Sequence, residues 1–166
     1  MKHQEKKYQI NSFNHVIGVL KRLGALKKSG KVTHHYYGQS DGNDVTKLVK
    51  YQDKCEIHIL KETDGKFDLT DNIPVKDIKD GLKWLKTNGF KAVDIIKMEN
   101  IDYEYNGGLV RLYTIDDWLK SVILDYPKGK HEKIAEKLGL VSNDQIKVPY
   151  NKHLASLGKL RSREVN

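Results

Sequence analysis

The sequence predicts an α+β fold whose antiparallel β-sheet closes, or nearly closes, into a tunnel or barrel with helices packed outside. Three observations lead to this prediction. Most segments alternate apolar and polar residues, which is the period of a strand. The turn Asn106-Gly107-Gly108 joins two such segments directly, as a hairpin requires. Charged residues recur on one side of several strands. In a closed sheet these charged sides would all face the interior, whereas in an open sheet they would face water.

Length and composition indicate a globular protein with one core. The chain has 166 residues, of which 38% are hydrophobic and 31% charged. We expect one domain over residues 1–157 and a polar, mobile tail over residues 158–166. No apolar run approaches the length of a membrane span, and the first residues do not resemble a signal peptide. The single cysteine, Cys55, forms no internal disulfide, and we expect a cytoplasmic protein.

The net charge of +8 favours polyanionic partners, namely nucleic acid, nucleotides or polyphosphate. Few of the 30 basic residues are arginine, and no run of five like charges occurs. Because arginine is the usual residue for contacts with bases and duplex phosphates, a phosphate-binding pocket is favoured over a surface for nucleic acid.

The first half of the chain predicts strands separated by two helices. In the first strand Tyr8 and Ile10 share one side, while Glu5 and Lys7 share the other. Apolar residues then recur at helical spacing up to Gly24, and Pro74 is expected to open a second helix as its first residue. The expected strands are residues 6–10, 32–37, 45–51 and 55–61.

The second half predicts a hairpin-rich sheet followed by two helices. Gly89 ends the second helix, and Gly139 ends the third. The expected strands are residues 92–105, 109–115 and 121–126, and the expected helices are residues 129–138 and 148–157.

Short charged motifs follow one another along these strands. They are His3-Gln4-Glu5-Lys6-Lys7, Leu48-Val49-Lys50, Ile57-His58-Ile59-Leu60-Lys61, Lys97-Met98-Glu99, Asp116, Ile123-Leu124-Asp125 and Tyr150-Asn151-Lys152-His153-Leu154. Their order and spacing over residues 3–157 resemble the CYTH superfamily, the triphosphate-tunnel enzymes that include class IV adenylyl cyclases and thiamine triphosphatases.

This resemblance implies a site in which inward cations neutralise phosphates and inward carboxylates bind Mg²⁺ or Mn²⁺. The residues that it implies for ligand binding are Lys7, Lys50, Lys61 and Lys97, with further candidates in Arg111 and Tyr37. The metal would be held by Glu5 and Asp125, helped by Asp116. The candidates for catalysis are Glu5, Asp125 and Glu99.

The sequence also departs from the family pattern at four positions. His3 and Ile123 stand where the family has metal-binding glutamates, and Leu48 and Glu99 stand where it has arginines. Lys47 beside Leu48 is a substitute after a small shift. We therefore expect the metal to be held weakly without substrate, and degeneration of the catalytic site is the simplest account.

Three functions remain open at this point. The first, which we take as the leading function, is binding of a nucleotide or polyphosphate with metal-dependent triphosphate hydrolysis or cyclisation. The second is a non-catalytic protein that sequesters or senses a phosphorylated small molecule. The third is RNA binding by the positive exterior, which strong salt dependence would reveal. Whether the protein is an enzyme stays open, and so does its assembly into a homodimer.

Overall fold

The computed structural model describes residues 2–165 and shows an α+β fold built on an antiparallel sheet, as the sequence predicts. The strands are β1 (His3–Ile10), β2 (Leu26–Lys27), β3 (Lys31–Gly38), β4 (Val45–Lys50), β5 (Cys55–Thr63), β6 (Lys66–Val75), β7 (Ala92–Tyr105), β8 (Gly108–Ile115), β9 (Leu119–Pro127), β10 (Gln145–Ile146) and β11 (Arg161–Glu164). The helices are α1 (Asn14–Arg22), α2 (Ile78–Thr87), α3 (His131–Leu138) and α4 (Tyr150–Ser156), with a 3-10 turn, η1 (Ser142–Asp144).

The strands of the described residues follow a cyclic order. Their hydrogen-bonded order runs β10-β1-β6-β5-β4-β3-β7-β8-β9, and β9 pairs with β1 as well. The strand order therefore returns from β9 to β1, as in a closed sheet, which confirms the predicted fold class. None of the helices in this part of the chain is both long and apolar enough to cross a membrane.

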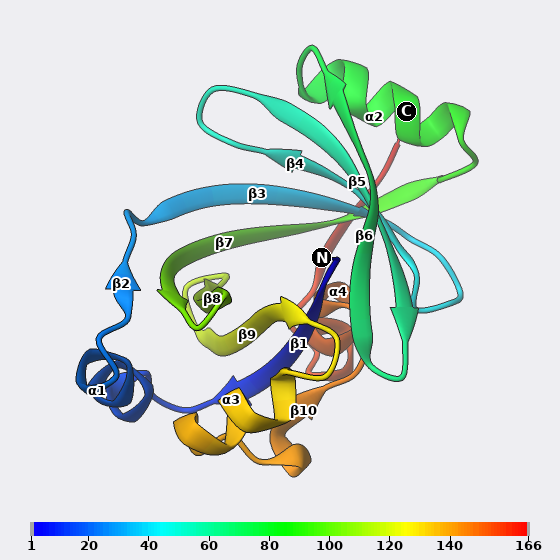
Figure 1. The fold of residues 1–166 in the computed structure, drawn as a ribbon. Coiled ribbons are helices and arrows are strands. Elements are labelled where there is room, and N and C mark those ends of the chain that lie inside the picture. The colour runs from blue at the N-terminus through cyan, green and yellow to red at the C-terminus, as the bar shows by residue number, and fades with distance from the viewer. Residues whose placement is uncertain (1, 166) are drawn as a thin grey trace. The chain divides into compact units, whose positions relative to one another are not determined.

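The chain forms two compact units. Unit 1 contains the described residues up to Lys31, then Asp64–Lys66 and Glu99–Lys147. Unit 2 contains Val32–Thr63, Phe67–Met98 and the residues from Val148 onward. The long strand β7, drawn in green in Figure 1, contributes residues to both units.

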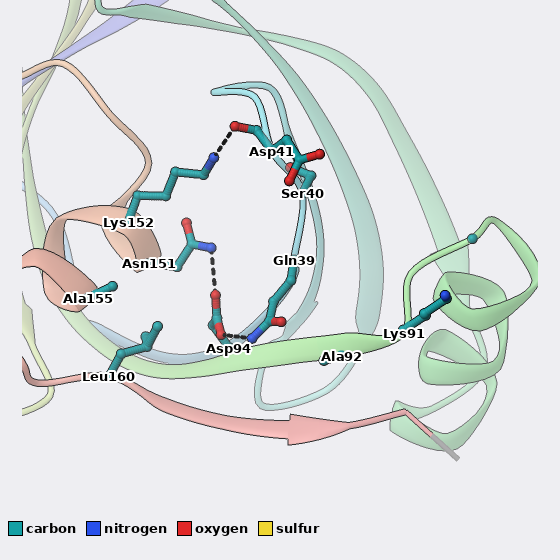
Figure 2. A pocket seen from close by; sticks show the side chains of 11 residues that line it. Gln39, Ser40, Asp41, Lys91, Ala92, Asp94, Asn151, Lys152, Ala155 and Leu160 are labelled. Carbon is teal, nitrogen blue, oxygen red and sulfur yellow. Dashed lines mark hydrogen bonds between the residues drawn. The ribbon is translucent and has the colours of Figure 1, made fainter.

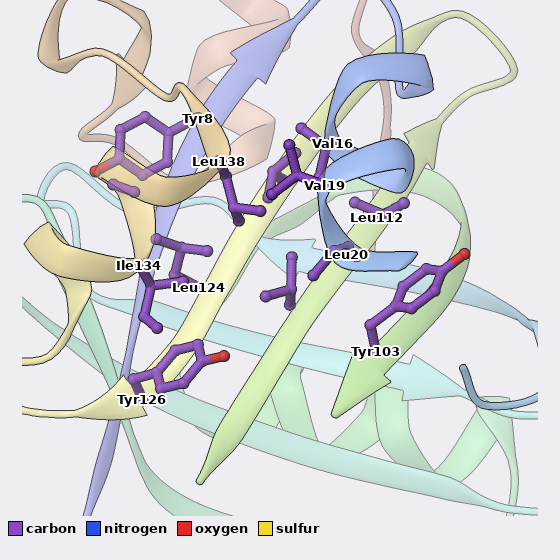
Figure 3. Packing of buried hydrophobic residues seen from close by; sticks show 13 residues of the cluster. Tyr8, Val16, Val19, Leu20, Tyr103, Leu112, Leu124, Tyr126, Ile134 and Leu138 are labelled. Atoms are coloured by element: carbon purple, nitrogen blue, oxygen red, sulfur yellow. The ribbon is translucent and has the colours of Figure 1, made fainter. Parts of the chain in front are cut away.

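Unit 1 packs two helices against one face of its strands. β1 and β8 each pair with β9 in antiparallel register. Figure 3 shows the core that forms against α1 and α3, in which Leu20, Leu124 and Ile134 are at most 2% exposed. Each such side chain contributes about 1.5–3 kcal/mol when it leaves water. The apolar alternation of β8 and β9 thus fixes which face of each strand is covered.

Unit 2 packs α2 against the strands β3, β4 and β5, which pair in that order. Leu48 of β4 meets Gly81 of α2 so closely that a Cβ at position 81 would lie 2.4 Å from the leucine Cδ1. Glycine is therefore needed at this contact. Both Leu48 and Leu85 are fully buried in the resulting core.

Two expectations about the elements were wrong. Pro74 lies in β6, and α2 begins after Asp77, whose side chain accepts a hydrogen bond from the backbone N–H of Asp80 at 2.9 Å. The segment after Gly158 is not a mobile tail, because Arg161–Glu164 pairs with β7 as β11. Its polar sequence lacks the apolar alternation that would indicate a strand. The boundary of a single domain at residue 157 stays a prediction.

Candidate functional site

Strands β1, β8 and β9 of unit 1 share a polar face. Alternate residues of a strand point to opposite sides, and Tyr8, Leu112 and Leu124 belong to the core on one side. The opposite side carries a set that we name the Arg111 face: His3, Glu5, Lys7, Arg111 and Asp125. The structure therefore brings four of the predicted site residues onto one surface of unit 1.

The guanidinium of Arg111 is held between two aspartates. Its Nη1 donates to Asp102 Oδ2 and its Nη2 to Asp125 Oδ2, each at 2.9 Å. All three side chains are at most 23% exposed, so these charge-assisted bonds are only weakly screened by water. The Nε of Arg111 is buried and has no hydrogen-bond partner.

The remaining oxygens of these two aspartates are occupied as well. Asp125 Oδ1 lies 3.2 Å from His3 Nδ1, and Asp102 Oδ1 accepts from Asn100 Nδ2 at 2.8 Å. Every carboxylate oxygen of the pair thus has a partner. Asn100 and Asp102 were missed by the sequence analysis, because nothing local indicates that they meet Arg111.

Burial alone would lower the pKa of Arg111, but its surroundings outweigh that effect. Tyr113, Glu5 and Asp102 raise the pKa electrostatically, and the hydrogen bond to Asp125 raises it further. The pKa of Arg111 therefore ends above its ordinary value. This cation is permanent at any pH at which the protein is folded.

A hollow of about 680 Å³ opens beside Arg111 within unit 1. The charged side chains that line it are Lys28, Lys31, Arg111, Asp102 and Glu104, and His3 lines it too. Lys28 and Glu104 form an ion pair at 2.8 Å. Three cations against two carboxylates leave an excess of one positive charge before His3 is counted, so the hollow favours an anion.

Asp116 does not join the predicted metal ligands. Asp125 lies opposite Leu109 at one end of the β8–β9 pairing, whereas Asp116 follows Ile115 at the other end. Six residues of a strand span roughly 20 Å, so Asp116 and Asp125 cannot ligate one ion. This part of the predicted metal site was wrong, because it used sequence order without the register.

Lys50 and Lys61 lie on the apolar side of their strands. Lys50 stands opposite Cys55 and shares its side of β4 with Leu48. Lys61 is exposed and shares its side of β5 with Ile57. Leu48, Cys55 and Ile57 all belong to the core with α2. A motif match that is wrong by one residue moves a side chain to the other face, so the expected facing of both lysines was wrong.

Lys97 and Glu99 of β7 also lie on the other side of their strand from the one expected. In unit 2, Lys97 shares its side of the strand with the core residue Val93. In unit 1, Glu99 shares its side with the core residue Tyr103. The polar side of β7 carries Asp94, Asn100 and Asp102 instead. The expected inward facing of Lys97 and Glu99 is corrected accordingly.

Unit 2 has a polar face of its own, which we name the Lys47 face: His35, Tyr37, Lys47, Glu56 and His58. Lys47 stands between Tyr37 and His58 in the strand register, and its Nζ donates to the Tyr37 hydroxyl at 3.3 Å. The Lys47 Nζ also lies 4.8 Å from the centre of the Tyr37 ring. The predicted ligand residue Tyr37 thus lies beside Lys47 rather than Lys50.

The histidines of the Lys47 face are held uncharged. Burial, followed by the positive charge of Lys47, lowers the pKa of His35 well below its ordinary value. Burial also lowers the pKa of His58, although its hydrogen bond to Glu56 at 2.9 Å opposes the shift. At neutral pH this face therefore carries Lys47 as its cation and Glu56 as its anion.

The predicted Mg²⁺ or Mn²⁺ does not fit the donors as they are arranged. Among residues 2–165, three or more His, Cys, Asp or Glu side chains nowhere gather as a metal group. Asp125 has both oxygens engaged by Arg111 and His3, and Ile123 lies where the resemblance implies a carboxylate. Hard divalent ions need several oxygen ligands at once. The guanidinium of Arg111 binds the carboxylates of Asp102 and Asp125 instead.

Comparison with known proteins shows the fold. No family model and no curated protein matches the sequence. The solved structure of PH1012 from Pyrococcus horikoshii OT3 is 19% identical, with 89% of this chain and 96% of that chain covered and a TM-score of 0.76. A structure from Vibrio parahaemolyticus, described as a candidate adenylate cyclase, is 11% identical, covers 93% and 98%, and has a TM-score of 0.66.

A third solved structure is that of HpAC1 from Hippeastrum, described as a candidate adenylyl cyclase with a dominant triphosphatase activity. It is 11% identical, with 96% of this chain and 97% of that chain covered and a TM-score of 0.61. Identities this low show the fold alone. The chain therefore shares its fold with solved structures that are described as candidate adenylyl cyclases, one of them with a dominant triphosphatase activity.

Proposed function

We propose that this protein binds a phosphorylated small molecule, a nucleotide or a polyphosphate, through the cations of the Arg111 face. The observation that carries the proposal is the buried Nε–H of Arg111, which has no acceptor although both other nitrogens are bound. A buried donor without a partner costs about 1–3 kcal/mol. A phosphate oxygen in the adjoining hollow would supply that acceptor.

The cations that line the hollow support an anionic ligand. The hollow has an excess of cationic side chains in its lining. Lys7, only 5% exposed, adds an ammonium group to the same face of unit 1. Fixed cations in a site that excludes water attract phosphate more strongly than cations on an open surface do. The solved structures that share the fold and are described as cyclase or triphosphatase agree with this ligand class.

We further propose that binding needs no divalent metal. In a metal-dependent site, a cation neutralises the carboxylates and bridges them to the phosphates. Here the guanidinium of Arg111 already bonds to both Asp102 and Asp125. We therefore propose that the protein sequesters or senses its ligand and does not convert it to a product.

Metal-dependent hydrolysis or cyclisation is the second candidate. One observation favours it: Glu5 and Asp125 stand directly opposite each other in the β1–β9 register. Opposite residues of an antiparallel pair have Cβ atoms about 4.5–5.5 Å apart, so these two carboxylates are neighbours. A ligand that displaced Arg111 from Asp125 would leave two adjacent carboxylates for a metal.

Calorimetric titration with tripolyphosphate and ATP, in chelator and in magnesium or manganese, tests both candidates. We expect binding in chelator, and Lys7→Ala should weaken it by about 1–3 kcal/mol, the scale of a charge-assisted hydrogen bond. Lys6→Ala is the matched control, because Lys6 occupies the other side of β1 and its Nζ contacts Glu132 at 3.5 Å. That variant should bind as wild type does.

Two results would reject the proposal. The first is no binding of either compound under any condition. The second is equal loss in Lys6→Ala and Lys7→Ala, which would indicate non-specific attraction. Release of phosphate or pyrophosphate that requires metal and disappears in Asp125→Asn would replace sequestration by the second candidate.

A further inference from the structure

A second hollow, of about 530 Å³, lies within unit 2 and is built from four separate segments. They are the residues after β3, the start of β7, helix α4 and the approach to β11. Figure 2 shows how the side chains of Gln39, Asp94, Asn151 and Lys152 surround it. None of its residues belongs to the Arg111 face, so a ligand in this hollow would be independent of the proposed function.

Asp94 is the polar centre of this hollow. Its side chain is 3% exposed. Oδ1 accepts from Gln39 Nε2 at 2.7 Å and from Ser162 Oγ at 2.6 Å, and Oδ2 accepts from Asn151 Nδ2 at 2.8 Å. All three donors are neutral, and none of these contacts of Asp94 is an ion pair. A carboxylate offers about four acceptor positions, and the three bonds leave one on Oδ2.

Asn151 adds a second unused acceptor. Because the carboxylate of Asp94 only accepts, the amide of Asn151 must turn its nitrogen toward it and its oxygen away, as Figure 2 shows. That oxygen, Oδ1, is buried and accepts no hydrogen bond, and the residue is 5% exposed. The hollow therefore presents two acceptors without donors, one on a carboxylate and one on an amide.

A purely structural role explains only part of this arrangement. The three bonds to Asp94 tie the segment after β3, helix α4 and strand β11 to β7. Such a tie does not explain why a carboxylate with only neutral donors stands here, or why the amide oxygen is unused, since buried polar atoms are normally paired. A ligand with several N–H donors and a positive charge would satisfy both.

The other charged groups of the lining are Asp41, Lys91 and Lys152. Figure 2 shows the Lys91 side chain pointing away from Asp94 and Asn151, whereas Lys152 extends on their side of the hollow. Lys152 Nζ is positioned by a single hydrogen bond to the backbone oxygen of Asp41 at 2.8 Å, which leaves further N–H donors on that nitrogen. A ligand that carries a carboxylate or phosphate opposite to its amine matches Lys152.

We infer that this hollow binds a small zwitterion. Its protonated primary amine contacts Asp94 Oδ2 and Asn151 Oδ1, and its carboxylate or phosphate contacts Lys152. The ligand class is that of an ω-amino acid or an amino alkyl phosphate, whose two charged ends are joined by a short chain.

An NMR titration of isotope-labelled wild-type protein with γ-aminobutyrate, n-butylamine and butyrate tests this inference. We expect γ-aminobutyrate to shift the side-chain amide signals of Asn151 and Gln39, and each singly charged probe to bind about tenfold more weakly. Asp94→Asn keeps the shape and removes the charge, so it should weaken γ-aminobutyrate binding by about tenfold. Asp53→Asn, an equal change at an exposed site of unit 2, should have no effect.

A second variant keeps the inference testable if Asp94→Asn does not fold. Lys152→Met should abolish the preference for γ-aminobutyrate over n-butylamine and leave the affinity for n-butylamine unchanged. The inference is overturned if no probe shifts the Asn151 amide, or if n-butylamine binds wild type as well as γ-aminobutyrate does. Unchanged binding in a folded Asp94→Asn variant overturns it as well.

Discussion

The two polar faces arise from the same strand alternation but differ in how their charges are compensated. On the Arg111 face, one guanidinium is bound by Asp102 and Asp125 and stays charged. On the Lys47 face, His35 and His58 lose their charge because burial lowers their pKa. One face is thus organised by ion pairs and the other by desolvation.

This difference teaches that alternation alone does not set the electrostatic character of a face. The permanent charge of Arg111 should make its two ion pairs important for the stability of unit 1. The neutral histidines of unit 2 should make the Lys47 face sensitive to mild acid. Three experiments test this contrast, from the largest expected effect to the smallest.

Removal of the guanidinium should have the largest effect. Arg111→Met leaves Asp102 and Asp125 close together without a cation, and we expect a loss of about 2–3 kcal/mol in the free energy of unfolding, below the full cost for a completely buried pair. The released carboxylates should then bind a divalent ion, so millimolar manganese should restore part of the loss. Urea unfolding in chelator and in manganese measures both effects.

Arg22→Met is the control for this variant, because Arg22 is exposed on α1. It should change the free energy of unfolding by less than about 0.5 kcal/mol. Manganese that stabilised wild type and Arg111→Met equally would show that Arg111 does not stand in for a metal. An Arg111→Met protein as stable as wild type would show that the ion pairs contribute nothing.

The two lysines of β4 give the next largest effect. Lys47→Ala should lower the free energy of unfolding by about 1 kcal/mol, because it removes the hydrogen bond to the Tyr37 hydroxyl and the contact with the Tyr37 ring. Lys50→Ala should change it by less than about 0.5 kcal/mol, because Lys50 Nζ makes an exposed hydrogen bond to the backbone oxygen of Gln52. Urea unfolding of both variants measures the difference. An equal or larger loss in Lys50→Ala would show that the contacts of Lys47 on the polar face do not stabilise unit 2.

The pH dependence of stability should show the smallest effect. The pKa of His35 is lower in the folded than in the unfolded protein, so below about pH 6.5 the unfolded chain binds more protons. Stability should therefore fall as the pH falls below about 6.5, by up to about 1.4 kcal/mol for each pH unit from this one group. Unfolding measured between neutral and mildly acidic pH tests the slope.

Replacement of the histidine should reduce that slope. His35→Gln removes the titrating group and should make the slope shallower than that of wild type. If this variant retained the wild-type slope, the acid sensitivity would arise from other groups, such as His131, whose pKa burial also lowers.

Much of the fold could be predicted because its determinants are local. Alternation placed Glu5 and Lys7 on one side of β1 and Tyr8 on the other, as the structure shows. The Asn106-Gly107 turn was recognised from its residues, and both adopt the positive φ angles that such a turn requires. Gly139 likewise ends α3 with a φ of +71°.

The charged site was harder to predict, because a strand face depends on register. Lys47 and Lys50 lie three residues apart on one strand and therefore point to opposite sides, and only the pairing with β3 and β5 decides which side is polar. A motif match without that register chose Lys50 and offered Lys47 only as a substitute after a small shift. The same error affected Lys61, Lys97 and Glu99.

The sequence by itself determined the fold class, the turns and the polar side of β1, because each depends on neighbouring residues and their period. The tertiary structure alone decided the partners: Asp102 with Arg111, and Gln39, Asn151 and Ser162 with Asp94. These contacts join residues that no local pattern connects. Which charge is compensated, and by what, therefore followed from the register of the strands and the docking of the C-terminal segment within unit 2.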